Sequence, residues 1–135
     1  VFNHNLETVS RLTPQIRNRA EYHKSLKVLE FAANYSNIPV KSGIMLGLGE
    51  YHDEIESAIR DLFNAGVKLL TLGQYLPPSQ AHWPLARYVT PEEFDLWRDF
   101  ALKLGFSAVA SSPLVRSSFQ AKELALAAGW KQSIL

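Results

Sequence analysis

Hydrophobic and polar positions form two patterns along the chain. Some apolar residues occur in short runs, and others recur at helical spacing. The apolar runs predict strands over residues 1–6, 40–46, 67–72 and 106–110. Apolar side chains three and four residues apart predict helices over residues 21–35, 53–65, 91–104 and 119–128. The chain is therefore expected to alternate strand and helix from beginning to end.

Residues that favour helix ends mark two of these elements. Thr90-Pro91-Glu92-Glu93 combines an N-cap threonine, a proline at the first helical position and a glutamate that would complete a capping box. Gly66 and Gly105 follow the last positions of two helices, where glycine readily adopts the left-handed conformation that ends a helix.

Alternating strands and helices predict a parallel α/β sheet with right-handed crossovers. Four such units make half of an eightfold barrel or a small open sheet. A half barrel alone exposes two sheet edges, which favours an incomplete domain. The irregular stretch 74–90 follows the third strand, at the end where parallel folds place their active-site loops.

Composition narrows the class of protein. The 135 residues are 47% apolar and 20% charged with a net charge of +1, which predicts a globular protein without a nucleic-acid tail. Charged residues interrupt every hydrophobic stretch, so no membrane span is expected. The absence of cysteine excludes a disulfide scaffold, a cysteine zinc site and a thiol nucleophile on this chain. With neither a starting Met nor a signal-peptide pattern, we expect a soluble piece of a longer protein.

Motifs of several common sites are missing. Gly47-Leu48-Gly49 supplies two glycines of a dinucleotide fingerprint, but His52 stands at the third position. The sequence has no Walker loop, no G-x-S-x-G elbow and no H-E-x-x-H motif. Its four histidines lie on separate segments without metal-ligand spacing.

Two polar segments at strand ends carry candidate chemistry. In the segment 3–8, alternation places Asn3, Asn5 and Glu7 on one side, and an amide beside a carboxylate suits the hydroxyls of a ribose. A strand end capped by turn-forming asparagines explains that segment equally well. In the segment 41–50, three glycines before Glu50 allow a flat ligand or another backbone to approach closely. A simple glycine-rich turn is the alternative there.

Five segments, in order along residues 1–121, resemble motifs of radical S-adenosylmethionine (SAM) enzymes. Residues 43–50 match the pattern G-x-I-x-G-x-x-E with Met45 in place of isoleucine. Residues 3–8 resemble the ribose-binding strand shared by biotin synthase and lipoyl synthase. Three more segments resemble the lipoyl synthase family in particular, at residues 70–76, 87–94 and 113–119.

The lipoyl synthase resemblance implies that residues 1–135 form the C-terminal half of one partial (β/α)6 barrel domain, with a serine motif at 116–119. Members carry two 4Fe-4S clusters: one reduces SAM to a 5′-deoxyadenosyl radical and the other is consumed as the sulfur source. The radical abstracts hydrogen from carbons 6 and 8 of a protein-bound octanoyl group, where sulfur is inserted to form the lipoyl group. The absence of cysteine then implies that the cluster cysteines lie outside this chain, which alone is expected to be inactive.

The same resemblance assigns individual roles. Asn5 and Glu7 would hold the SAM ribose, the backbone around Met45 would lie along the adenine, and Glu50 would brace that turn. The implied catalytic residues are Arg116 and Ser118, with Ser118 as an iron ligand of the consumed cluster and Ser117 as the second choice. A serine oxygen is a harder ligand than a thiolate and protonates readily on release. Without the resemblance, Ser118 is expected only to cap the final helix.

The implied partners are octanoylated carrier domains, namely E2 subunits of 2-oxoacid dehydrogenases and the glycine cleavage H protein, and an electron donor such as ferredoxin or flavodoxin. No nucleic acid and no membrane is expected, and the location would be cytoplasmic, or mitochondrial or plastid in a eukaryote. Three alternatives are a biotin-synthase-like enzyme, a non-catalytic carrier-binding module and an α/β small-molecule binder. Departures from the family pattern are Phe119 for tyrosine, Ser112 for glycine, Trp83, and the tail 130–135.

Overall fold

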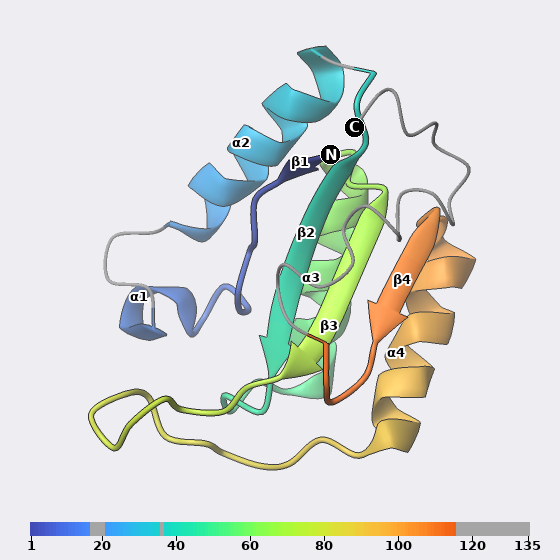
Figure 1. Cartoon of the computed structure of the whole chain (residues 1–135). Coiled ribbons are helices and arrows are strands. Elements are labelled where there is room, and N and C mark those ends of the chain that lie inside the picture. Colours follow the sequence, from blue (N-terminus) through green and yellow to red (C-terminus); the bar gives the residue numbers. More distant parts are fainter. Residues whose placement is uncertain (17–20, 36, 116–135) are drawn as a thin grey trace.

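The computed structural model describes residues 1–16, 21–35 and 37–115. Four parallel strands form one sheet in the order β1-β2-β3-β4 (Figure 1). The strands are β1 (Phe2–Asn3), β2 (Val40–Leu46), β3 (Leu69–Gln74) and β4 (Ala108–Ser111). The helices are α1 (Thr13–Ile16), α2 (Tyr22–Tyr35), α3 (His52–Asn64) and α4 (Pro91–Leu104). The predicted parallel α/β fold is confirmed.

The core lies between one face of the sheet and the helices. Alternate residues of the two central strands, such as Ile44 and Leu72, are buried in one cluster with apolar side chains of α2, α3 and α4. The remaining residues of these strands, such as Met45 and Gly73, belong to the opposite face. That face is the one relevant to a ligand, because α2, α3 and α4 pack on the other face.

Two predicted strands begin later than expected because the preceding helices close with an extra turn. The amide of Val67 donates to Leu62 at 3.1 Å, and the amide of Phe106 donates to Ala101 at 3.2 Å. Residues just after each capping glycine therefore belong to the helix end. Gly66 and Gly105 do have positive φ, 95° and 131°, as their positions predicted.

The first strand is much shorter than the predicted span 1–6. β1 has two residues, and the chain leaves the regular ladder before Glu7 forms an isolated bridge with Ile44. Strand β2 and helix α4 have the predicted bounds, whereas α3 begins and ends one residue earlier than expected. Helix α1 was not predicted, and the helix expected over 119–128 lies outside the described residues. Among the described residues, no helix is long and apolar enough to cross a membrane.

Candidate functional site

The segments that follow the strands meet at the carboxyl edge of the sheet (Figure 1). They are residues 4–8 after β1, the turn 47–51 after β2, the long loop 75–90 after β3, and residues 112–115 after β4. Ligands of parallel α/β folds bind at this edge, because the connecting loops there vary without disturbing the sheet. The candidate site is therefore built from these four segments.

Glu7 is held in an unusual backbone conformation at this edge. Its φ of 73° lies in the left-handed region, which is costly for a residue with a side chain. Two backbone hydrogen bonds hold it there: the Glu7 amide donates to Gly43 O at 2.9 Å, and the Met45 amide donates to Glu7 O at 2.9 Å. The neighbouring β2 strand thus fixes the direction in which the half-buried Glu7 side chain leaves the backbone.

A narrow hollow on the face of the sheet opposite the core brings several predicted residues together. Its lining includes Glu7, Gly43, Met45, Thr71 and Gly73. Asn5 reaches the same place, since a Cβ added to Gly43 would lie 3.1 Å from Asn5 Oδ1 and 2.5 Å from Thr71 Oγ1. The expected common side of Asn5 and Glu7 is therefore observed, although Asn3 is exposed on β1 and does not line this hollow.

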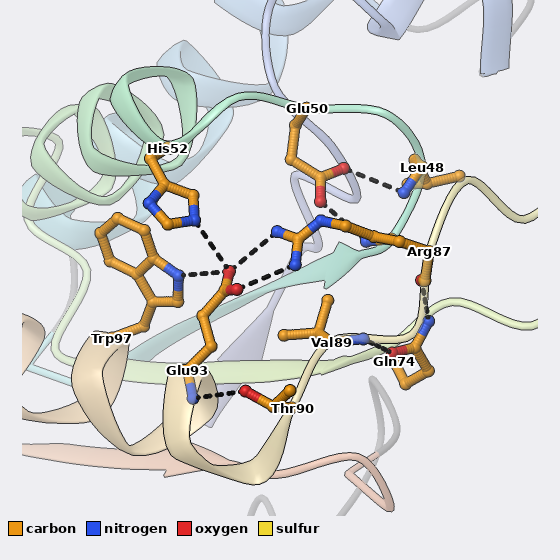
Figure 2. Close-up of polar contacts among 10 residues, drawn as sticks. Leu48, Glu50, His52, Gln74, Arg87, Val89, Thr90, Glu93 and Trp97 are labelled. Carbon is orange, nitrogen blue, oxygen red and sulfur yellow. Dashed lines mark hydrogen bonds and ion pairs between the residues drawn. The ribbon is translucent and has the colours of Figure 1, made fainter.

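Glu50 closes the turn that follows β2. Its carboxylate accepts hydrogen bonds from the amides of Gly47 at 2.7 Å and Leu48 at 3.0 Å (Figure 2). Gly47 and Gly49 have φ of 103° and 113°, which allow the chain to fold back onto this buried carboxylate. The resemblance implied that Glu50 braces this turn, and its two hydrogen bonds to amides of the turn have the geometry expected for such a role.

The loop 75–90 holds the same turn from the outside. Amides of Tyr75 and Ala86 donate to Leu46 O and Gly47 O, each at 2.8 Å. The indole of Trp83 donates to Leu48 O at 2.8 Å. Three successive carbonyls of the β2 end are thereby bonded to one loop.

Gln74 fixes the far end of that loop. Its side-chain amide donates to Arg87 O at 3.1 Å and accepts from the Val89 amide at 2.8 Å (Figure 2). A side chain on Gly47 would overlap this arrangement, with a Cβ 2.5 Å from Gln74 Nε2 and 2.6 Å from Arg87 O. Glycine at position 47 is therefore required for the loop and the turn to pack together.

A second anchor ties the loop to helix α4. Arg87 forms two hydrogen bonds of 2.8 Å with the Glu93 carboxylate, which also accepts from Trp97 Nε1 at 3.2 Å and lies 3.5 Å from His52 Nε2 (Figure 2). The Arg87 hydrogen bonds, opposed by partial burial and helped by Trp97, lower the pKa of Glu93 to about 2. Glu93 is therefore ionised throughout the neutral range.

This network corrects the capping-box prediction for α4. Thr90 does cap the helix, because its hydroxyl accepts from the Glu93 amide at 3.1 Å. The Glu93 side chain, however, is directed to Arg87 and Trp97 and not back to the Thr90 amide (Figure 2). A charged partner outside the helix offers the carboxylate a stronger interaction than a neutral amide.

An exposed ion pair holds the outer rim of the turn. Arg11 contacts both oxygens of Glu54 at 2.9 and 3.0 Å and donates to Gly49 O at 2.9 Å. Glu54 in turn accepts from the Tyr51 amide at 2.8 Å, so that the start of α3 and the turn are joined. The hydrogen bond from Arg11 lowers the pKa of Glu54.

The structure groups part of the predicted site and adds residues that sequence reasoning missed. Asn5, Glu7 and Met45 meet at the hollow, and Glu50 holds the adjoining turn. The missed residues are those that secure the turn from other segments: Arg11, Gln74, Trp83, Arg87 and Glu93. Only the position of the loop 74–90 after a strand hinted at their role.

The predicted cluster residues cannot be placed. Arg116, Ser117 and Ser118 lie outside the described residues, as does Phe119. Within the described part of the chain, no three His, Asp or Glu side chains come together as metal ligands would. The described residues therefore show no set of donors for an iron–sulfur cluster.

Comparison with known proteins identifies similar sequences. The chain is 57% identical to the lipoyl synthase of Syntrophotalea carbinolica over 92% of its length, and 51% identical to that of Pelobacter propionicus over 93%. It is 56% identical to the lipoyl synthase of Haemophilus influenzae over 90% of its length. The chain spans 42%, 42% and 38% of the length of these relatives. No family model matches.

Proposed function

Because the chain belongs to the lipoyl synthase family, we propose that it works as part of an enzyme that inserts sulfur at carbons 6 and 8 of a protein-bound octanoyl group. The whole activity requires more than these residues, since the relatives are more than twice as long as the matched part. Residues 1–135 would form part of one radical SAM barrel domain. Each relative named above is a lipoyl synthase, which favours this function over a biotin-synthase-like one.

The polar groups at the carboxyl edge suit the hydroxyls of the SAM ribose. A ribose presents hydroxyls that both donate and accept, and the carboxylate of Glu7 and the amide of Asn5 offer acceptors and donors on one side of the sheet. The left-handed backbone at Glu7, held by two hydrogen bonds to β2, is strain of the kind that accumulates at ligand sites. The proposal is carried by one observation: the Glu7 side chain leaves a strained backbone whose direction is fixed by β2.

The chain's own residues would position the ligand and exclude water. Asn5 and Glu7 would bind the ribose, and the backbone at Met45 would lie along the adenine. Glu50 would keep the turn closed beside it. SAM, when bound, supplies the carbon-centred radical chemistry typical of this superfamily.

For the iron–sulfur clusters, the described residues do not fit. Lipoyl synthases generally use 4Fe-4S clusters, but the chain has no cysteine and the described residues show no convergent ligand set. Ser118, with Ser117 as the second choice, is proposed as a ligand of the consumed cluster, and Arg116 as its catalytic neighbour. A Ser118→Ala enzyme should still cleave SAM but should not complete sulfur insertion, and an unchanged lipoyl yield contradicts that role.

The proposed partners follow from the same activity. The substrate would be an octanoylated carrier domain, of a 2-oxoacid dehydrogenase E2 subunit or the glycine cleavage H protein. Electrons would come from a ferredoxin or flavodoxin. In a bacterial source such an enzyme would act in the cytoplasm.

SAM binding tests the site directly. In a cluster-loaded enzyme of the relatives' length that contains this chain, calorimetry should show SAM binding, with affinity reduced about 10- to 100-fold by Glu7→Gln and clearly reduced by Asn5→Ala. Asn3→Ala is the matched control, since Asn3 lies exposed two positions before Asn5. Equal affinity for all variants rejects the site, and absence of SAM binding by the unsubstituted enzyme rejects the function.

A further inference from the structure

Trp83 connects two segments of the site that the sequence keeps apart. Its indole N–H donates to Leu48 O at 2.8 Å, across 35 positions of the chain. Its own carbonyl accepts from the Tyr75 hydroxyl at 2.5 Å. Trp83 is thus bonded both to the turn after β2 and to the residue that follows β3.

The turn needs such an external tie. Two glycines with positive φ give the stretch 47–50 more backbone freedom than other residues would, and that freedom must be removed by contacts. Glu50 satisfies the amides on the inner side of the turn. On the outer side, the Leu48 carbonyl receives its hydrogen bond from Trp83, and Leu48 itself is only 3% exposed. Without the indole N–H, this carbonyl would lose its partner in a place poorly reached by water.

We propose that Trp83 is a positioning residue for SAM binding, which keeps the turn after β2 in its ligand-binding form by holding the Leu48 carbonyl. The inference rests on the proposed function, because it takes Met45 and the adjoining turn as part of the SAM site. Trp83 itself does not touch the ligand. It acts through the turn, so its loss weakens ligand binding while leaving the chemistry of the bound complex intact.

The test compares Trp83→Phe with a matched control in the cluster-loaded, full-length enzyme containing this chain. Phenylalanine keeps an aromatic ring but removes the N–H, and we expect a SAM dissociation constant about 3- to 10-fold higher by calorimetry. The KM for SAM should rise in step, with kcat at saturating SAM within about twofold. Tyr88→Phe is the control, because it removes a polar group from an aromatic side chain of the same loop that is 73% exposed. It should leave the SAM affinity unchanged.

Two further measurements separate this inference from simple loss of stability. Tyr75→Phe removes the hydroxyl that bonds the Trp83 carbonyl, and it should weaken SAM binding in the same direction but less, even if Trp83→Phe folds poorly. A SAM affinity equal to that of the unsubstituted enzyme in both Trp83→Phe and Tyr75→Phe overturns the positioning role. So does a loss of affinity in Tyr88→Phe as large as that in Trp83→Phe. If the unsubstituted enzyme fails to bind SAM, the proposed function is overturned as well. That outcome differs from failure of the positioning role alone, in which the unsubstituted enzyme still binds SAM.

Discussion

The ion pair between Arg87 and Glu93 should stabilise the chain in a pH-dependent way. Glu93 is the better buried partner, with a side chain 14% exposed against 37% for Arg87. Lowering its pKa from 4.5 to about 2 corresponds to about 3 kcal/mol, or about 2 kcal/mol once solvent screening of the exposed arginine is allowed for. Removing the charge by Glu93→Gln should therefore lower the free energy of unfolding at pH 7 by about 2 kcal/mol.

The sign of the pH dependence follows from the lowered pKa. The folded state holds Glu93 ionised, so the stabilisation is complete above pH 4.5 and is lost as the pH falls toward 2. Urea denaturation of both proteins should give a stability difference at pH 7 that has shrunk by about half at pH 3. Tryptophan fluorescence can follow the unfolding.

A surface ion pair supplies the control. Glu56 contacts Arg60 one helical turn away, with side chains 44% and 51% exposed, and Glu56→Gln should cost less than about 0.5 kcal/mol. A Glu93→Gln difference that stays constant from pH 7 to pH 3, or one no larger than that of the control, refutes the assignment of the stabilisation to this ion pair.

Three other substitutions test packing at the site. Glu50→Gln should destabilise the chain by about 1–3 kcal/mol in urea denaturation, because glutamine keeps one neutral acceptor oxygen and leaves the other of the two amides without an acceptor. Gly43→Ala should cost about 1–3 kcal/mol and weaken SAM binding, since the new methyl group would lie 2.5 Å from Thr71 Oγ1. Thr8→Val should raise the free energy of unfolding by up to about 1 kcal/mol, because the fully buried Thr8 hydroxyl has no hydrogen-bond partner among the described residues.

The sequence alone determined the bounds of those helices and strands whose ends depend on residues nearby in the chain. Helix α4 begins and ends where its threonine cap, proline and glycine place it. Strand β2 has its predicted bounds because Pro39, which is disfavoured inside a helix, precedes it and a glycine turn follows its apolar end. The motifs of the same segments also brought the resemblance to lipoyl synthases, which the similar relatives confirm.

Only the tertiary structure decided how the site is held together. The left-handed backbone of Glu7 results from pairing with β2, more than 30 positions away, and no local pattern predicts it. The Glu93 side chain does not form the expected capping interaction, because Arg87 lies within reach of its carboxylate. The Leu48 carbonyl accepts its hydrogen bond from the Trp83 indole, 35 positions away in the sequence. A charged or polar group forms its strongest interaction with whichever partner the fold brings within reach, and that partner can be far away in the sequence. Apolar periodicity and helix caps depend instead on residues that are close in the sequence. The sequence alone therefore determines which segments form the site, and the fold determines what fixes them.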